Sequence, residues 1–252
     1  MKCVILAAGM ATRMASRTGG NPKCLLTVGG VPILRRIIDN VTAAGVEEIV
    51  LVLGYRADVV RRFVKQTFPF HRIRFAMNPK FDSTNNAFSL LMARNHIVEG
   101  TKVPPVSHAF LLLDADIVFS SLLLPALLKH ASPDKIAVRV RGGHDEEEVR
   151  VRIDAEGAVR QIGKTIPLSE SYGESVGIEV FSSDTARRLF EVLEQRVRNG
   201  EGRGEFYEAT FQSLVDEGIR LHAVDVSDFP SIEIDTPEDL DIAERVIVPL
   251  IA

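Results

Sequence analysis

Two basic side chains, Arg13 and Lys23, lie in the segment that follows the first apolar run of the chain, residues 3–8. This segment has neither the G-x-x-x-x-G-K-[ST] spacing of a P-loop nor the G-x-G-x-x-G of a dinucleotide fold, because Gly9 is its only glycine before residue 19. Backbone N–H groups of residues 7–12, together with an arginine fork and a lysine point charge, can still hold two phosphates of one triphosphate. Charge alone favours the alternative, an ordinary loop with solvated basic residues.

Carboxylates follow two other apolar segments. Asp114 and Asp116 end "LLLDAD", where their period-two spacing puts them on one side, and Asp235 ends "IEID". Asp235 could instead cap the next helix, but Thr236 is available as that cap. Carboxylates from separate strand ends suit a hard cation such as Mg²⁺, which also binds substrate phosphates.

Polar side chains gather after the third apolar run. Asn78, the pair Asn85 and Asn86, and Ser89 one helical turn later can offer amide and hydroxyl groups to the edge of a pyrimidine. Helix capping is a strong alternative for Asn85 or Thr84 taken singly. Two adjacent asparagines at the start of a helix favour a role in ligand binding.

The elements that must position these residues alternate in type. Apolar runs of strand length alternate with helix-period segments up to residue 116, which predicts a doubly wound, mostly parallel α/β sheet. Ligands of such sheets bind at the carboxyl ends of the strands. We therefore expect the site in the loops that follow Leu6, Leu53, Met77 and Leu113.

The pattern changes after about residue 135. Period-two alternation around "DAEG" predicts a small antiparallel β insertion, and helical segments then return, ending in a helix opened by Thr236 and Pro237. No repeat or long linker interrupts the chain. We therefore expect one domain over residues 1–252, with a nucleotide-binding half (1–134) and an acceptor-binding half (135–252) that contains the second metal aspartate.

Composition limits the partners. The chain has 252 residues, 30 basic and 34 acidic, and a net charge of −4, so no overall basic field attracts nucleic acid or an anionic membrane. Cys3 and Cys24 have no metal or disulfide spacing and are expected to be buried thiols. The first apolar run is shorter than the core of a signal peptide, and no stretch is long enough to span a membrane. We expect a cytoplasmic protein, and the sequence leaves its oligomeric state open.

The order L-A-A-G-x-x-[ST]-R followed by P-K resembles the nucleotidyltransferase superfamily that makes nucleoside-diphosphate-activated sugars and alcohols. The resemblance extends over nearly the whole chain, through "KCLLTVGGVPIL", "IVLVLGYRAD", "LLLDADIVF" and "IEIDTPEDL". Its most specific part is "NPKFDSTNNAFSL", which is similar to a block of cytidylyltransferases that act on phosphocholine and related alcohol phosphates or phosphonates, such as aminoethylphosphonate.

The resemblance implies a Rossmann-like fold and Mg²⁺-dependent transfer of a nucleotidyl group, most specifically from CTP to a small phosphorylated alcohol or phosphonate, with release of pyrophosphate. It implies catalytic roles for Arg13 and Lys23 and places the metal on Asp116 and Asp235. The nucleotide-binding residues that it implies are Leu6, Ala7, Ala8, Gly9, Met10, Ala11, Thr12, Arg13, Lys23, Asn78, Thr84, Asn85, Asn86, Ser89 and Asp114.

The acceptor side is expected to involve Arg150, Glu174, Tyr207 and Glu208. The chain has no tryptophan and three tyrosines, which argues against an aromatic cage for a quaternary ammonium. The two glutamates can pair a primary ammonium or bind sugar or cyclitol hydroxyls. Arg150 can hold the acceptor phosphate or lie exposed on its strand, and the acidic run 145–148 is interpreted as a solvated turn.

Two other functions stay open. One is a nucleotidyltransferase for a sugar 1-phosphate or a cyclitol phosphate. The other is a catalytically silent nucleotide-binding module, which is left open by Ala11, where relatives usually have glycine. At this position either φ is negative, or a methyl group crowds the triphosphate.

Overall fold

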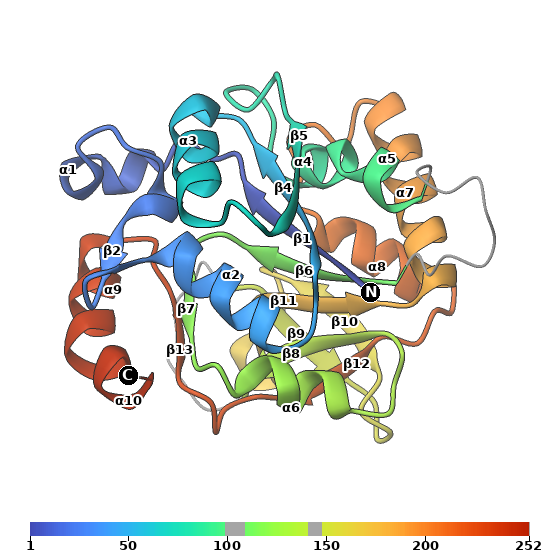
Figure 1. Ribbon diagram of the computed structural model, residues 1–252. Helices are drawn as coiled ribbons and strands as arrows, with labels where there is room; N and C mark the ends of the chain where they lie inside the picture. Colours follow the sequence, from blue (N-terminus) through green and yellow to red (C-terminus); the bar gives the residue numbers. More distant parts are fainter. Residues whose placement is uncertain (99–108, 141–147, 252) are drawn as a thin grey trace.

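Strands and helices alternate through the first half of the chain, as the apolar runs predict (Figure 1). The computed structural model describes residues 1–98, 109–140 and 148–251. Its elements up to residue 129 are β1 (Lys2–Ala7), α1 (Ala15–Thr18), β2 (Thr27–Val28), β3 (Val31–Pro32), α2 (Ile33–Ala43), β4 (Glu48–Leu53), α3 (Ala57–Thr67), β5 (Arg72–Met77), α4 (Asn86–Met92), α5 (Arg94–Ile97), β6 (Phe110–Asp114), β7 (Ile117–Phe119) and α6 (Leu123–Lys129).

The second half is mainly antiparallel before its helices return, which agrees with the predicted insertion. The predicted turn "DAEG" joins the strands at residues 150–153 and 159–163. The elements are β8 (Lys135–Arg139), β9 (Arg150–Ile153), β10 (Val159–Gly163), β11 (Gly173–Phe181), α7 (Ser183–Arg198), α8 (Glu208–Asp216), β12 (His222–Asp225), β13 (Ser231–Glu233), α9 (Pro237–Ile242), a π-helical turn (Ala243–Ile247) and α10 (Val248–Ile251).

One nine-stranded sheet runs through the molecule in the order β10-β9-β11-β6-β1-β4-β5, and β8 joins β11 to β12. The neighbours β6, β1, β4 and β5 are parallel, whereas β11 is antiparallel to β6, β8 and β9. The predicted α/β fold with a mostly parallel core is therefore confirmed. The carboxyl ends of β1 and β6 lie side by side, where ligands of such sheets bind.

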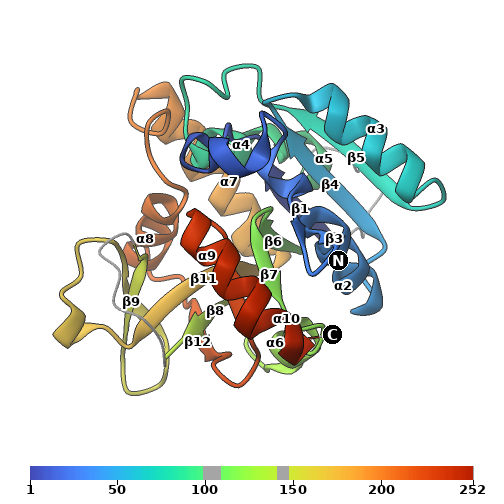
Figure 2. The same cartoon turned by 90° about the vertical axis from the view of Figure 1, so that its left-hand side faces the viewer.

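Helices cover both faces of the sheet. Figures 1 and 2 show α2 and α6 on one face and α4, α7 and α8 on the other. Alternate side chains of β1 enter the two cores, since Cys3 and Ile5 pack with α2 while Val4 and Leu6 pack with α4. Because both faces of this strand are buried, its sequence is a continuous apolar run rather than an alternating one. Cys3 and Cys24 are buried free thiols, as expected.

The segment that closes the chain begins as predicted. Thr236 caps α9, its side chain accepting a hydrogen bond from the backbone N–H of Asp239, and Asp239 bonds back to the backbone of Thr236. This reciprocal capping fixes the direction in which the chain leaves β13. Asp235, which directly precedes the cap, is thereby held at a defined place.

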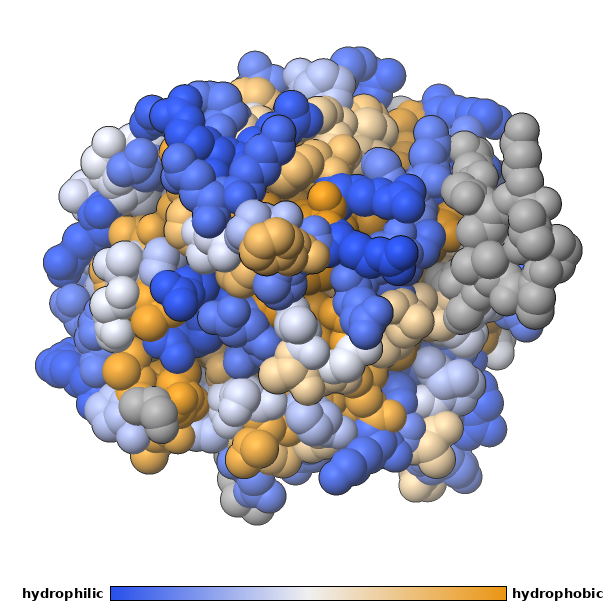
Figure 3. Space-filling view, in the orientation of Figure 1, coloured by the Kyte–Doolittle hydropathy of each residue, from blue (hydrophilic) through white to orange (hydrophobic). Residues whose placement is uncertain are grey.

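Polar and apolar side chains are interspersed on the face shown in Figure 3. None of the described helices is long and apolar enough to cross a membrane.

Candidate active site

A cavity of about 400 Å³ opens beside the carboxyl ends of β1 and β6. Its walls come from the loop after β1, the segment before α4, the turn after β6, the middle of β11 and the start of α8. Three of the four loops expected from the sequence contribute. The loop after Leu53 does not line the cavity. It packs instead against the loop after β1, where the backbone N–H of Tyr55 donates to the carbonyl of Ala8.

The loop after β1 turns sharply at Ala11, whose φ of 50° and ψ of 47° are left-handed. The first of the two sequence alternatives, a negative φ, is therefore wrong. A residue with a Cβ costs about 1–2 kcal/mol in this conformation. The turn leads into a 3₁₀ turn (Thr12–Met14) that carries Arg13 to the rim of the cavity.

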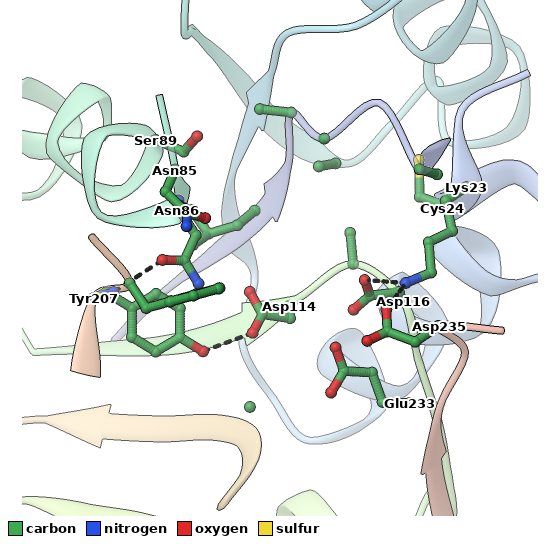
Figure 4. A pocket seen from close by; sticks show the side chains of 18 of the residues that line it. Lys23, Cys24, Asn85, Asn86, Ser89, Asp114, Asp116, Tyr207, Glu233 and Asp235 are labelled. Carbon is green, nitrogen blue, oxygen red and sulfur yellow. Dashed lines mark hydrogen bonds and ion pairs between the residues drawn. The ribbon is translucent and has the colours of Figure 1, made fainter. Parts of the chain in front are cut away.

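Lys23 contacts both predicted metal aspartates. Its Nζ donates to Oδ2 of Asp116 at 2.8 Å and to Oδ1 of Asp235 at 2.5 Å (Figure 4). Arg13 donates to the other oxygen of Asp235 at 2.9 Å. Residues from three distant parts of the sequence are therefore neighbours, as their positions at strand ends and in the first loop predict.

The charges of this group depend on one another. Burial opposes the charge of the Lys23 ammonium, but the carboxylates of Asp116 and Asp235 outweigh it and raise the pKa of Lys23. Burial likewise opposes ionisation of Asp235, and Lys23 together with Arg13 nevertheless lowers the pKa of that carboxyl. Lys23 and Asp235 are therefore both charged near neutral pH.

A third carboxylate, Glu233, completes an acidic cluster. Oxygen atoms of Asp116, Glu233 and Asp235 lie within 4.8 Å of one another, and Oδ1 of Asp116 is buried with no hydrogen-bond partner among the described residues. Oxygen donors with one orphaned atom fit a hard divalent cation. Glu233 was not among the predicted metal residues, although it lies two residues before Asp235 in "IEID" and so on the same side of an extended strand.

The predicted asparagines have two different roles: one supports the segment before α4, and the others line the cavity. Asn78 is 1% exposed and donates to Thr84 and Ser89, so it holds the segment before α4 and does not line the cavity. Asn85 caps α4 by accepting from the backbone N–H of Asn86, as the capping alternative predicts, and it also lines the cavity. Thr84 and Ser89 line it as well.

Tyr207, from the second half of the chain, forms hydrogen bonds with Asn86 and Asp114 of the first half. The side-chain oxygen of Asn86 accepts from the backbone N–H of Tyr207, and the Tyr207 hydroxyl donates to Asp114 at 2.6 Å (Figure 4). Gly177 has a φ of 69°, and a Cβ there would lie 3.0 Å from Oδ2 of Asp114. Burial and the charge of Asp116 raise the pKa of Asp114, which the Tyr207 bond partly offsets.

The predicted acceptor residues do not all reach the cavity. Glu174, Tyr207 and Glu208 line it, and Glu174 is ion-paired with Arg139 at 2.7 Å. Arg150 does not, because its guanidinium turns to the backbone carbonyl of Ile166.

Another basic residue, Lys164, lines the cavity instead. Its Nζ lies 4.5 Å from the ring centroid of Phe206, and its charge acts on both Asp235 and Glu208. Glu148, from the acidic run interpreted as a turn, also lines the cavity, while residues 145–147 of that run lie outside the described residues. Lys164 directly follows β10, a strand of the insertion. The local sequence does not indicate that the end of this strand lies at the cavity. Met10 is the remaining predicted residue that does not line the cavity.

The chain has recognisable relatives. A family model described as MobA-like NTP transferase domain matches residues 3–210. The CMP-5'-(3-aminopropyl)phosphonate synthase of Streptomyces rubellomurinus is 27% identical over 246 residues, which make up 95% of this chain and 37% of that longer protein. The 2-aminoethylphosphonate cytidylyltransferase of Lancefieldella rimae is 26% identical over 231 residues, 91% of this chain and 87% of the relative.

The fold also has solved counterparts. The CTP:phosphocholine cytidylyltransferase of Streptococcus pneumoniae superposes with a TM-score of 0.75 and 19% identity, covering 98% of each chain. At this level of identity the similarity shows a common fold.

Proposed function

Because the chain belongs to the family of MobA-like NTP transferase domains, we propose that it is a cytidylyltransferase that joins CTP to a small phosphorylated or phosphonate acceptor and releases pyrophosphate. The resemblance to nucleotidyltransferases seen in the sequence is confirmed by the family match. One observation carries the proposal: Lys23 bridges Asp116 and Asp235 directly beside the loop after β1, at the ligand end of the sheet.

In the proposed reaction, an acceptor oxygen attacks the α-phosphorus of the nucleotide in line and displaces pyrophosphate. The acceptor oxygen is already anionic near neutral pH, so no protein nucleophile or general base is required. Catalysis then consists mainly of positioning the reactants and neutralising charge.

Arg13 and Lys23 are proposed to contact different phosphates of the nucleotide. Arg13, with its side chain 54% exposed at the rim, is placed to hold the departing β- and γ-phosphates. Lys23, 12% exposed, is placed to contact the α-phosphate and the acceptor.

The base is proposed to lie against the start of α4. The side-chain oxygens of Asn85 and Asn86 accept backbone N–H groups, which leaves their amide N–H₂ groups as donors toward the cavity. Cytosine presents two acceptors, O2 and N3, on the edge that such donors can reach. The choice of cytosine also rests on the cytidylyltransferases among the relatives.

Mg²⁺ is proposed to bind Asp116 and Asp235, with Glu233 alongside. When bound, it would stabilise the charge that develops on the phosphates. Lys23 and Asp235 are both charged near neutral pH, which is the state that these roles require.

Lys164, rather than the predicted Arg150, is proposed to hold the acceptor's phosphate or phosphonate. It lines the cavity and lowers the pKa of Asp235, so its charge acts on the region where the acceptor oxygen must lie.

A screen of pyrophosphate release tests the proposal. Four nucleoside triphosphates are crossed with phosphocholine, 2-aminoethylphosphonate, inositol phosphate and hexose 1-phosphates in the presence of Mg²⁺. We expect release with CTP and an alcohol phosphate or phosphonate. Preference for a hexose or inositol phosphate would change the proposed acceptor to a sugar or cyclitol phosphate. No release from any pair would favour a silent nucleotide-binding module.

Two variants serve as controls for the screen. Lys23→Ala should abolish most release, whereas Lys65→Ala, an exposed lysine of α3, should leave it unchanged.

A further inference from the structure

Glu208 presents a buried carboxylate oxygen that nothing in the described part of the chain satisfies. The residue is 8% exposed, lines the cavity, and its Oε2 has no hydrogen-bond partner. Burial raises the pKa of this carboxyl to about 7. Leaving such an oxygen unpaired is costly, so its position at a cavity wall indicates a ligand that donates a hydrogen bond.

A second buried carboxyl group, Glu179, interacts with Glu208. Glu179 is fully buried, and its Oε2 also lacks a partner among the described residues. Burial and the charges of neighbouring carboxyl groups, Glu208 among them, raise the pKa of Glu179, while Lys164 partly offsets the rise at Glu208. A positively charged group bound next to α8 would stabilise the ionised form of both carboxyl groups, so this end of the cavity favours a cation.

The arrangement does not suit a metal ion. Among the residues that the structure describes, the only group of three or more ligands close enough to share an ion is Asp116, Glu233 and Asp235. Glu208 lies outside that group. A cation that needs one or two hydrogen-bond acceptors, rather than a closed set of ligands, fits better.

A quaternary ammonium fits poorly as well. It has no N–H to give to Oε2 of Glu208, and it prefers the open faces of aromatic rings. Lys164 already covers one face of Phe206, and Tyr207 is fully buried. A primary ammonium has three N–H donors and needs no aromatic cage.

We propose that the acceptor is a zwitterion with a primary ammonium, and that Glu208 binds this ammonium while Lys164 binds the phosphate or phosphonate at the other end. This inference rests on the proposed function and narrows its acceptor. The opposite charges of Glu208 and Lys164 match the two ends of such a molecule.

The test compares three acceptors that differ only at one end: phosphoethanolamine, phosphocholine and 2-hydroxyethyl phosphate. With CTP and Mg²⁺, kcat/KM for phosphoethanolamine should exceed that for the other two acceptors by about 100-fold. Removing one partner of a buried charge pair typically weakens binding by about this factor. Glu208→Gln should remove about 100-fold with phosphoethanolamine and change the rate with 2-hydroxyethyl phosphate by less than about 3-fold.

Glu156→Gln is the matched control, because Glu156 is an exposed glutamate in the turn between β9 and β10. The acceptor series on the unaltered protein keeps the test decisive even if the Glu208 variant folds poorly. Equal or greater use of phosphocholine or 2-hydroxyethyl phosphate overturns the inference and leaves the cytidylyltransferase standing. So does release confined to an inositol or hexose phosphate, whereas absence of release from every pair overturns both.

Discussion

Replacing Lys23 by alanine should separate metal binding from turnover. Its ammonium holds Asp116 and Asp235 through two short hydrogen bonds. These are the carboxylates that we assign to the divalent ion, so lysine and metal compete for their negative charge. The substitution should therefore tighten metal binding while it slows the reaction.

The magnitudes follow from the contacts. Two charge-assisted hydrogen bonds contribute about 1.5–3 kcal/mol each, so recovering only half of the lower sum strengthens metal binding by about tenfold. The Lys23 side chain is 12% exposed, which leaves little screening by solvent. Losing one positioned charge at the reacting phosphorus typically lowers kcat by about 10²- to 10³-fold.

Two assays measure these effects. Binding of Mn²⁺ to the nucleotide-free protein is followed by electron paramagnetic resonance, and kcat by pyrophosphate release at saturating CTP. Lys65→Ala controls for the loss of a lysine, and thermal melting controls for folding. Weaker Mn²⁺ binding in the Lys23 variant would refute the competition, and an unchanged kcat would refute the catalytic role.

Four further predictions concern the loop and the join between the halves. Ala11→Gly relieves a left-handed alanine, so the free energy of unfolding should rise by up to about 1 kcal/mol in urea titrations, and a fall would contradict the assigned backbone. Tyr207→Phe removes the 2.6 Å bond to Asp114 and should lower the free energy of unfolding by about 2 kcal/mol, and an unchanged value would count against that bond. Burial raises the pKa of Glu208 from 4.5 to about 7, so the folded chain holds this proton more tightly than the unfolded chain; stability is full below the unfolded value and falls by up to about 3 kcal/mol as pH rises through about 7. In urea titrations across this pH range, Glu208→Gln should lose less stability than the unaltered protein. An equally steep loss in the variant would refute the assignment to Glu208. Asn86→Ala loses the acceptor of the Tyr207 backbone N–H and the proposed contact with the base, so KM for CTP should rise by about tenfold, with an unchanged KM as the contrary result.

Much of the fold follows from local pattern. Continuous apolar runs predict buried parallel strands, and period-two alternation predicts the antiparallel insertion, because each period reflects which faces of a strand are covered. The meeting of Lys23 with Asp116 and Asp235 follows as well, since strand ends and the first loop share one edge of the sheet.

The acceptor side of the site was harder to predict. Lys164 reaches the cavity only because β10 folds back beside β9 in a particular register, and no local pattern distinguishes it from Arg150. Asn78 was predicted to face the base, but its amide is used to hold Thr84 and Ser89. Tertiary contacts of this kind depend on side-chain packing that a linear pattern does not contain.

The most direct test follows the α-phosphate. The protein is incubated with Mg²⁺, CTP labelled at that phosphate and phosphoethanolamine, and the products are separated. The proposed reaction moves the label to a cytidylyl adduct of the acceptor, with one pyrophosphate released for each adduct formed. Label that stays in CTP, or appears only in CMP, would contradict it.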